Sequence, residues 1–156
     1  MAKQLINGMA MLVLVASVTF VTATAANAQT RSRLHANVPF EFTVGGKNLP
    51  AGQYNITGLF NSGETLVVSN GDESAVRLTN GMTSSETQSK SKLVFHRYGE
   101  RYFLSEVWTA GENTGRKLLS SKAEDAVRRE LTAVYRSRGI KQDVYERVEL
   151  VAAVTR

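Results

Sequence analysis

Ser91–Ala110, with the sequence SKLVFHRYGERYFLSEVWTA, contains two runs of strand-forming residues on either side of Gly99 and Glu100. Glycine at the first position of a two-residue loop favours a tight hairpin turn, because that position takes a positive φ. Such a turn sets the pairing of the two strands. The predicted pairs, from the turn outward, are Tyr98 with Arg101, Arg97 with Tyr102, His96 with Phe103 and Phe95 with Leu104.

Both faces of the predicted hairpin are apolar. One face carries Leu93, Phe95, Tyr102, Leu104 and Trp108, and the other carries Val94, His96, Tyr98, Phe103 and Val107. An antiparallel pair with one solvated face alternates apolar with polar residues, so the second apolar face must also be covered. We expect the cover to be a helix, a second sheet, a ligand or a partner chain.

A helix able to supply this cover follows the hairpin. Ser121-Lys122-Ala123-Glu124 fits a capping box, in which the serine caps the helix and the glutamate side chain reaches back to the cap. Apolar residues then recur at helical spacing: Val127, Leu131, Val134 and Tyr135. Gly139 is a natural stop. We therefore predict a helix over about residues 122–138 whose apolar stripe lies on the hairpin.

Period-two alternation and turn signals predict further strands. These strands cover residues 38–44, 54–60, 65–69, 75–79 and 116–120. Residues 80–92 are polar and are predicted to form a flexible loop or a solvated edge strand, and the tail over 140–156 favours a closing strand at 146–154. The predicted fold is mainly β: an antiparallel β-sandwich or flattened barrel of about seven strands with one C-terminal α-helix.

Residues 1–28 have the layout of a secretory signal peptide. Lys3 is followed by an uncharged apolar run, Met9–Ala23, and small residues stand at the cleavage positions Ala26 and Ala28. The run is shorter than the roughly 20 residues that cross a bilayer, which argues against a retained membrane span. We expect export to the periplasm or the cell exterior, with 29–156 as a single β-rich domain.

The composition excludes several classes of chemistry. The 156-residue chain has no cysteine, so disulfides, thiolate metal sites and cysteine nucleophiles are ruled out. The only histidines are His35, expected in a mobile mature N-terminus, and His96, expected to be a structural histidine or a polar anchor in a pocket. Neither has partners at ligand spacing, so no metal, cofactor or catalytic residue is predicted. Glu106 is predicted to be a buried carboxylate paired with Arg77 or Arg97.

Candidate ligand-binding residues gather around the hairpin: His96, Arg97, Tyr98, Arg101, Tyr102, Phe103 and Trp108. Guanidinium and aromatic groups at a loop tip stack on sugars or bind anionic polymers, and they also form ordinary cation–π ladders. The net charge of +5 suits an anionic envelope partner or plain solubility. The helix is basic, but i,i+4 pairs of Glu124 with Arg128 and Asp125 with Arg129 favour a solvated face, and export argues against nucleic acid.

Several segments together resemble one family. These segments are Val38–Gly45 (VPFEFTVG), Leu49–Tyr54 (LPAGQY), Leu93–Gly99 (LVFHRYG), Tyr102–Leu104 (YFL) and Val107-Trp108. In this order they resemble small exported proteins of unassigned function that are abundant in acidobacterial genomes. The resemblance covers about residues 36–130, and it implies export and a β-rich domain but no reaction.

Three functional hypotheses follow. The first is a non-enzymatic envelope or extracellular module that binds a protein partner or a cell-surface polymer. The second is a small-molecule carrier with an apolar pocket near His96, Tyr98, Phe103 and Trp108. A hydrolase is the weakest of the three, because no nucleophile elbow or carboxylate pair is evident.

Overall fold

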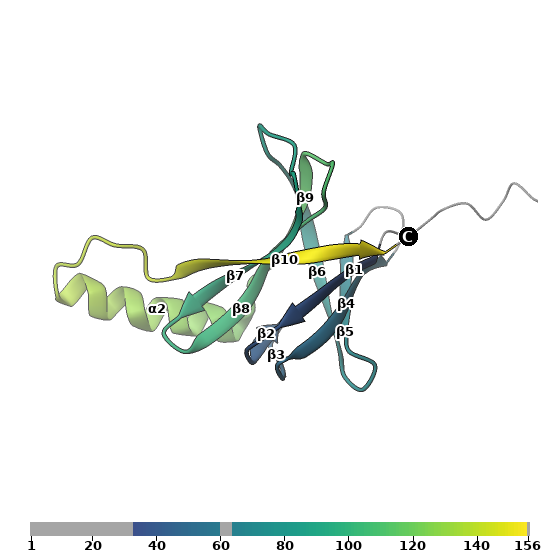
Figure 1. Ribbon diagram of the computed structural model, residues 1–156. Coiled ribbons are helices and arrows are strands. Elements are labelled where there is room, and N and C mark those ends of the chain that lie inside the picture. The colour runs from purple at the N-terminus through teal and green to yellow at the C-terminus, as the bar shows by residue number, and fades with distance from the viewer. Residues whose placement is uncertain (1–32, 60–63, 156) are drawn as a thin grey trace, which may run out of the picture. The chain divides into compact units, whose positions relative to one another are not determined.

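Ten strands and one helix make up the described part of the chain, residues 33–59 and 64–155 of the computed structural model, which belong to one unit, Arg31–Arg156. The predicted signal peptide lies outside the described residues. In chain order the elements are β1 (Arg33–Val38), β2 (Phe42–Val44), β3 (Lys47–Leu49), β4 (Gly52–Leu59), β5 (Thr65–Ser69), β6 (Ser74–Thr83), β7 (Ser91–Tyr98), β8 (Arg101–Trp108), β9 (Thr114–Leu118), α2 (Lys122–Ser137) and β10 (Glu146–Thr155) (Figure 1).

Eight of these strands close into a barrel. Their order is β8-β7-β10-β1-β4-β5-β6-β9, and β9 pairs back with β8, so the ring has no free edge. Every neighbouring pair in the ring is antiparallel. β2 adds to β8 in parallel, and β3 extends β2. The mainly β fold with a C-terminal helix is confirmed, but the sheet closes as a barrel and not as a sandwich, with more strands than predicted.

The β7–β8 hairpin has the predicted register near its turn. All four predicted pairs, from Tyr98–Arg101 to Phe95–Leu104, are present, and Gly99 has a φ of 64°. Beyond them the register shifts, because Val94 pairs with Glu106 and leaves Ser105 as an extra residue. This is a β-bulge.

The bulge reverses the predicted faces at the end of β8. Past Ser105, Val107 belongs to the main core cluster, whereas Trp108 lies outside both clusters of buried apolar side chains that the described residues form. The sequence prediction placed these two residues on the opposite faces, which is wrong because one extra residue flips every side chain that follows it.

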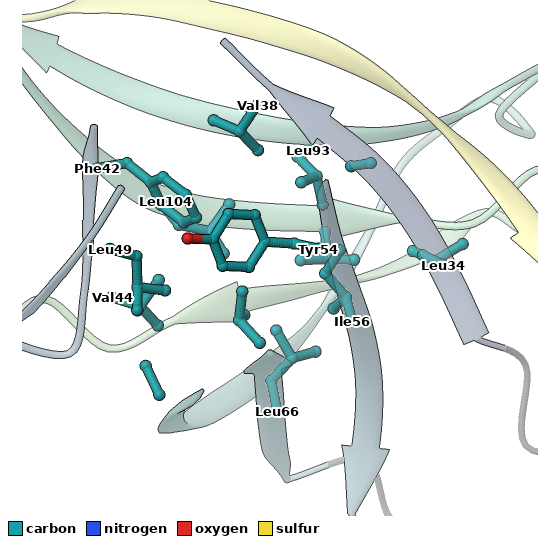
Figure 2. Close-up of a cluster of buried hydrophobic side chains, with 14 of the residues drawn as sticks. Leu34, Val38, Phe42, Val44, Leu49, Tyr54, Ile56, Leu66, Leu93 and Leu104 are labelled. Atoms are coloured by element: carbon teal, nitrogen blue, oxygen red, sulfur yellow. The ribbon is translucent and has the colours of Figure 1, made fainter. Parts of the chain in front are cut away.

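The barrel interior holds the main hydrophobic core. Figure 2 shows side chains of β1, β2, β4, β5, β7 and β8 pointing toward one another, with the Tyr54 ring beside Phe42. The two rings meet edge to face with centroids 5.0 Å apart, and the Tyr54 hydroxyl donates to the Pro50 carbonyl oxygen at 2.7 Å. Each fully buried side chain of this size contributes about 1.5–3 kcal/mol, so this interior supplies most of the stability.

The helix covers the outer face of the hairpin, as predicted from the sequence. Its N-cap is Ser121, whose Oγ accepts from the Glu124 N–H at 3.1 Å. Val127 is buried with Tyr98 and Phe103 in a second cluster, and α2 runs beside β7 and β8 (Figure 1). No helix among the described residues is long and apolar enough to cross a membrane.

Three strand predictions are corrected. The strand expected over 38–44 is divided into β1 and β2, because Pro39 lies between them and has no N–H to donate to a ladder. Residues 80–83, expected in a polar loop or edge strand, continue β6 and pair with β9. The strand expected over 116–120 is β9, which covers Thr114–Leu118.

Two predictions concern the ends of the domain. His35, expected in a mobile N-terminus, lies in β1 between its partners Asn55 and Ala153. The closing strand favoured for the tail is confirmed as β10, which joins β7 to β1 and completes the ring.

Candidate functional site

The seven residues proposed from the sequence do not form one site. Tyr98 and Phe103 are buried beneath α2, whereas Trp108 packs near Gly115 at the other end of the hairpin. Arg97, Arg101 and Tyr102 lie at the turn. His96 lines a separate crevice beside α2.

Two of the turn residues, Arg97 and Tyr102, contact each other. The Tyr102 ring stacks on Phe40 with centroids 3.8 Å apart, and the Arg97 guanidinium carbon lies over the same ring, 5.5 Å from its centroid. Arg97 Nη1 also lies 3.3 Å from a carboxylate oxygen of Glu146. The ring and its cation are therefore engaged within the fold, which favours the structural cation–π ladder over a sugar-stacking platform.

A crevice beside α2 has the most site-like composition. It is an open pocket of about 440 Å³, which we call the α2 crevice. It lies where β6 to β9 meet the start of α2. Its lining residues are Asn80, His96, Ser105, Lys117, Leu118, Leu119, Ser120, Glu124, Arg128 and Tyr145.

His96 is held from two sides at the edge of the α2 crevice. Its Nδ1 lies 3.0 Å from Oε1 of the buried Glu124, and the Tyr145 ring lies over the imidazole with centroids 4.1 Å apart. The carboxylate accepts, so Nδ1 carries the proton and donates. Nε2 has no hydrogen-bond partner among the residues the structure describes. Glu124 thus orients the ring and leaves Nε2 for a ligand.

Tyr98 completes this buried polar group. Its hydroxyl donates to the same Oε1 of Glu124 at 3.3 Å. Burial raises the pKa of Tyr98, and the negative charge of Glu124 raises it further. The Glu124 side chain was expected to reach back to the helix cap, but it contacts His96 and Tyr98 instead, because burial favours satisfying the polar groups beneath α2.

Ser105 contributes a free hydroxyl to the α2 crevice. The residue is 4 % exposed, yet within the described residues its side chain makes no hydrogen bond, including none to His96. Ser105 faces outward as regular alternation after Leu104 requires, and the bulge places Glu106 on that same face, where a regular strand would have turned the two to opposite faces. Among the described residues no buried side-chain oxygen or nitrogen lacks a partner, so the Ser105 oxygen is accessible from the crevice and can bind a ligand or water.

The charges around the α2 crevice are mainly positive. Lys117 forms no ion pair with any residue in the described ranges, and Arg128 lies 2.7 Å from Asp125. The only carboxylate in the lining is Glu124, which faces His96 and Tyr98. The i,i+4 pairs predicted for the helix are not formed in this part of the chain: Asp125 pairs with Arg128 at i,i+3.

The buried carboxylate predicted at Glu106 is present, but its partner was predicted wrongly. Arg147 of β10 approaches it with both terminal nitrogens, at 3.2 and 3.0 Å, and Trp108 Nε1 donates to it at 2.9 Å. Arg77 instead donates to the carbonyl oxygens of Leu119 and Ser120. The bulge places Glu106 on the outer face, where β10 supplies the cation.

Sequence reasoning missed most of the α2 crevice. Of its polar lining only His96 was proposed as ligand-binding. Lys117 and Asn80 lie opposite each other on β9 and β6, and no pattern along the chain shows that pairing. In the described ranges, no three His, Asp or Glu side chains are placed to hold a metal ion.

The comparisons with known proteins gave no match. No family model matches the chain, no curated protein is significantly similar to it, and no solved structure resembles its fold at a significant level. The class that the fold defines is therefore a mainly β protein with a closed barrel and a C-terminal helix.

Proposed function

We propose that this chain is a non-enzymatic, exported binding module that holds a small ligand, or the terminal group of a cell-surface polymer, in the α2 crevice. The observation that carries the proposal is the pocket of about 440 Å³ lined by polar side chains from four strands and a helix. Binding sites for small molecules typically measure about 300–1,000 Å³ and place a few polar groups on rigid elements.

The size of the pocket favours a small ligand over an extended polymer surface. Two other surface pockets of the described chain, of about 560 and 420 Å³, are similar in size, so the α2 crevice is distinguished by its lining and not by its volume. Of the four residues named in the carrier hypothesis, the α2 crevice is lined by His96 and not by Tyr98, Phe103 or Trp108, and its lining is largely polar. The ligand is therefore expected to be polar, and not the apolar molecule suggested by the sequence.

The state of Ser105 supports a binding role over hydrolysis. A serine nucleophile is activated by a base within hydrogen-bond reach. His96 and Ser105 line the same crevice, but no hydrogen bond joins them in the described part of the chain. Export rests on the layout of residues 1–28, and the resemblance to small exported acidobacterial proteins agrees with it.

A ligand screen with a blocked crevice tests the proposal. The exported protein is screened by thermal shift against polar metabolites and fragments of envelope polymers. A ligand at 100 times its Kd adds about 2.7 kcal/mol of stability, which is a clear rise in Tm. We expect that rise to disappear in Asn80→Trp, which fills the crevice from β6.

The control for this variant is Val151→Trp. Val151 lies on β10, is 66 % exposed and does not line the crevice. Its ligand response should equal that of the wild type. A response that survives Asn80→Trp, or a library with no responding compound, would contradict the proposal.

A second candidate function is the binding of a protein partner, which one observation favours. Val76, Leu78 and Leu119 are all more than 40 % exposed, and the Leu119 N–H donates to the Leu78 carbonyl, so they lie close together on the outside of the barrel. Exposed apolar patches mark interaction surfaces. Leu78→Glu should abolish capture of an envelope protein by cross-linking in cells, and unchanged capture would exclude this patch.

A further inference from the structure

We infer that the ligand of the α2 crevice carries an oxyanion, a phosphate or carboxylate group, which Lys117, Arg128 and the Ser105 hydroxyl bind. This inference rests on the proposed function and specifies the chemistry of its ligand. It draws on three features of the crevice: its charge, the accessible hydroxyl of Ser105 and its oriented histidine.

The charge of the lining favours an anion. Lys117 and Arg128 come from β9 and α2 and line the same pocket, and Lys117 has no ion-pair partner in the described ranges. The one negative side chain in the lining, Glu124, accepts hydrogen bonds from His96 and Tyr98 and is 7 % exposed. A bound oxyanion would give Lys117 the partner that it lacks, and Arg128, whose Nη2 lies 2.7 Å from Asp125, would contribute its remaining N–H donors.

The Ser105 hydroxyl shows that this is more than a patch of surface charge. Ser105 is 4 % exposed, and its hydroxyl oxygen, which makes no hydrogen bond to any described residue, is accessible from the crevice. Because Ser105 lies in β8 and not in a loop, the strand pairing fixes the position of its hydroxyl. Such a preplaced donor suits one oxygen of a tetrahedral or planar oxyanion.

His96 adds an acceptor that is already oriented. Because its Nδ1 donates to Glu124, the ring is held and Nε2 has no partner among the described residues. In this tautomer Nε2 carries a lone pair, so it can accept from the O–H of a hydrogen phosphate ion bound in the crevice. Asn80 on β6 offers an amide at the same pocket.

The test is an NMR titration of the exported protein with inorganic phosphate and, separately, with sodium acetate. Chloride holds the ionic strength constant, so general screening of charge does not vary. Saturable shifts confined to the amides of Ser105, Lys117 and Ser120 are expected. Tighter binding of phosphate would indicate a phosphate ligand, and tighter binding of acetate a carboxylate ligand.

Two variants and a matched control decide the result. Lys117→Gln should weaken binding about tenfold or more, and Ser105→Ala, which removes no charge, about threefold or more. Lys90→Gln makes the same charge change at an exposed lysine on the loop between β6 and β7, and it should bind like the wild type. Equal weakening by Lys90→Gln, or shifts spread over all basic residues, would overturn the inference.

Failure of the inference and failure of the proposed function give different results. If a neutral compound from the screen binds wild type but not Asn80→Trp, while phosphate and acetate do not bind, the oxyanion is refuted and the binding module stands. If neither the anions nor any screened compound binds the α2 crevice, both are refuted.

Discussion

Replacing Gly115 with alanine should strongly destabilise the protein, because Gly115 packs against the six-membered ring of Trp108. A Cβ built on Gly115 would lie 2.6 Å from Cε3 and 2.7 Å from Cδ2 of the indole. Carbon atoms pack at about 3.5–4.0 Å, so the overlap is about 1 Å. The indole is not free to move, because Trp108 is 4 % exposed and its Nε1 donates to Glu106.

The expected loss can be estimated from the two ways of relieving the overlap. Displacing β9 or the indole costs about 1–3 kcal/mol, as overpacking does elsewhere. Moving the indole also weakens a hydrogen bond to a buried carboxylate, worth about 1.5–3 kcal/mol. Alanine also restricts the unfolded chain, which stabilises the folded state by about 0.4–1 kcal/mol. We therefore expect a net loss of about 3 kcal/mol, or roughly 10 °C in Tm.

Urea unfolding measures this loss directly. Trp108 is the only tryptophan in the chain, so its fluorescence reports the site, and circular dichroism reports the sheet. The control is Gly81→Ala on β6, where a Cβ would meet only Arg116 Nη1 at 3.7 Å. It should remain within about 0.5 kcal/mol of wild type. If Gly115→Ala also remained within about 0.5 kcal/mol of wild type, Trp108 would not pack on β9, and the reversal of faces by the bulge would be refuted.

Three further predictions concern the buried polar groups. Arg147→Met should lower the free energy of unfolding by about 2 kcal/mol, because Glu106 keeps only its indole donor; a loss below about 0.5 kcal/mol in urea would contradict this. Burial and then Glu124 raise the pKa of Tyr98, so this tyrosine's contribution to stability is complete below pH about 10 and is lost as the pH rises toward the folded value. Tyr98→Phe should therefore flatten the alkaline fall in Tm, and an unchanged slope would count against it. Ser105 should not be labelled by a fluorophosphonate, because no hydrogen bond links it to His96 in the described chain; stoichiometric labelling by mass spectrometry would favour the hydrolase.

Features set by neighbouring residues were predictable. The turn at Gly99 and the four pairs beside it follow from one glycine, whose φ is 64°. The helix begins after Ser121, as the capping pattern indicates. The first half of its predicted apolar stripe, Val127 and Leu131, packs on the hairpin, whereas Val134 is exposed. In each case the physical cause acts within a few residues of the chain, so a local pattern carries the information.

The candidate site was not predictable in the same way. Glu124 has a local role in the capping pattern, yet its carboxylate meets His96, which lies 28 residues away. Glu106 was correctly expected to need a cation, but the cation is Arg147, 41 residues away. Apolar periodicity indicates that a face is buried and does not identify the charged side chain that another strand brings to it.

From its amino-acid order alone, this chain specifies a β-rich domain with a glycine-turned hairpin and one capped helix, because turns, caps and periodicity depend on neighbouring residues. Closure of the ring through β8 and β9, and the meeting of His96, Ser105, Lys117 and Glu124, appear only in three dimensions. The physical reason is that the α2 crevice depends on pairing between distant strands and on one extra residue in β8. A single bulge can move a carboxylate and an indole to another face while leaving the hydrophobic pattern almost unchanged.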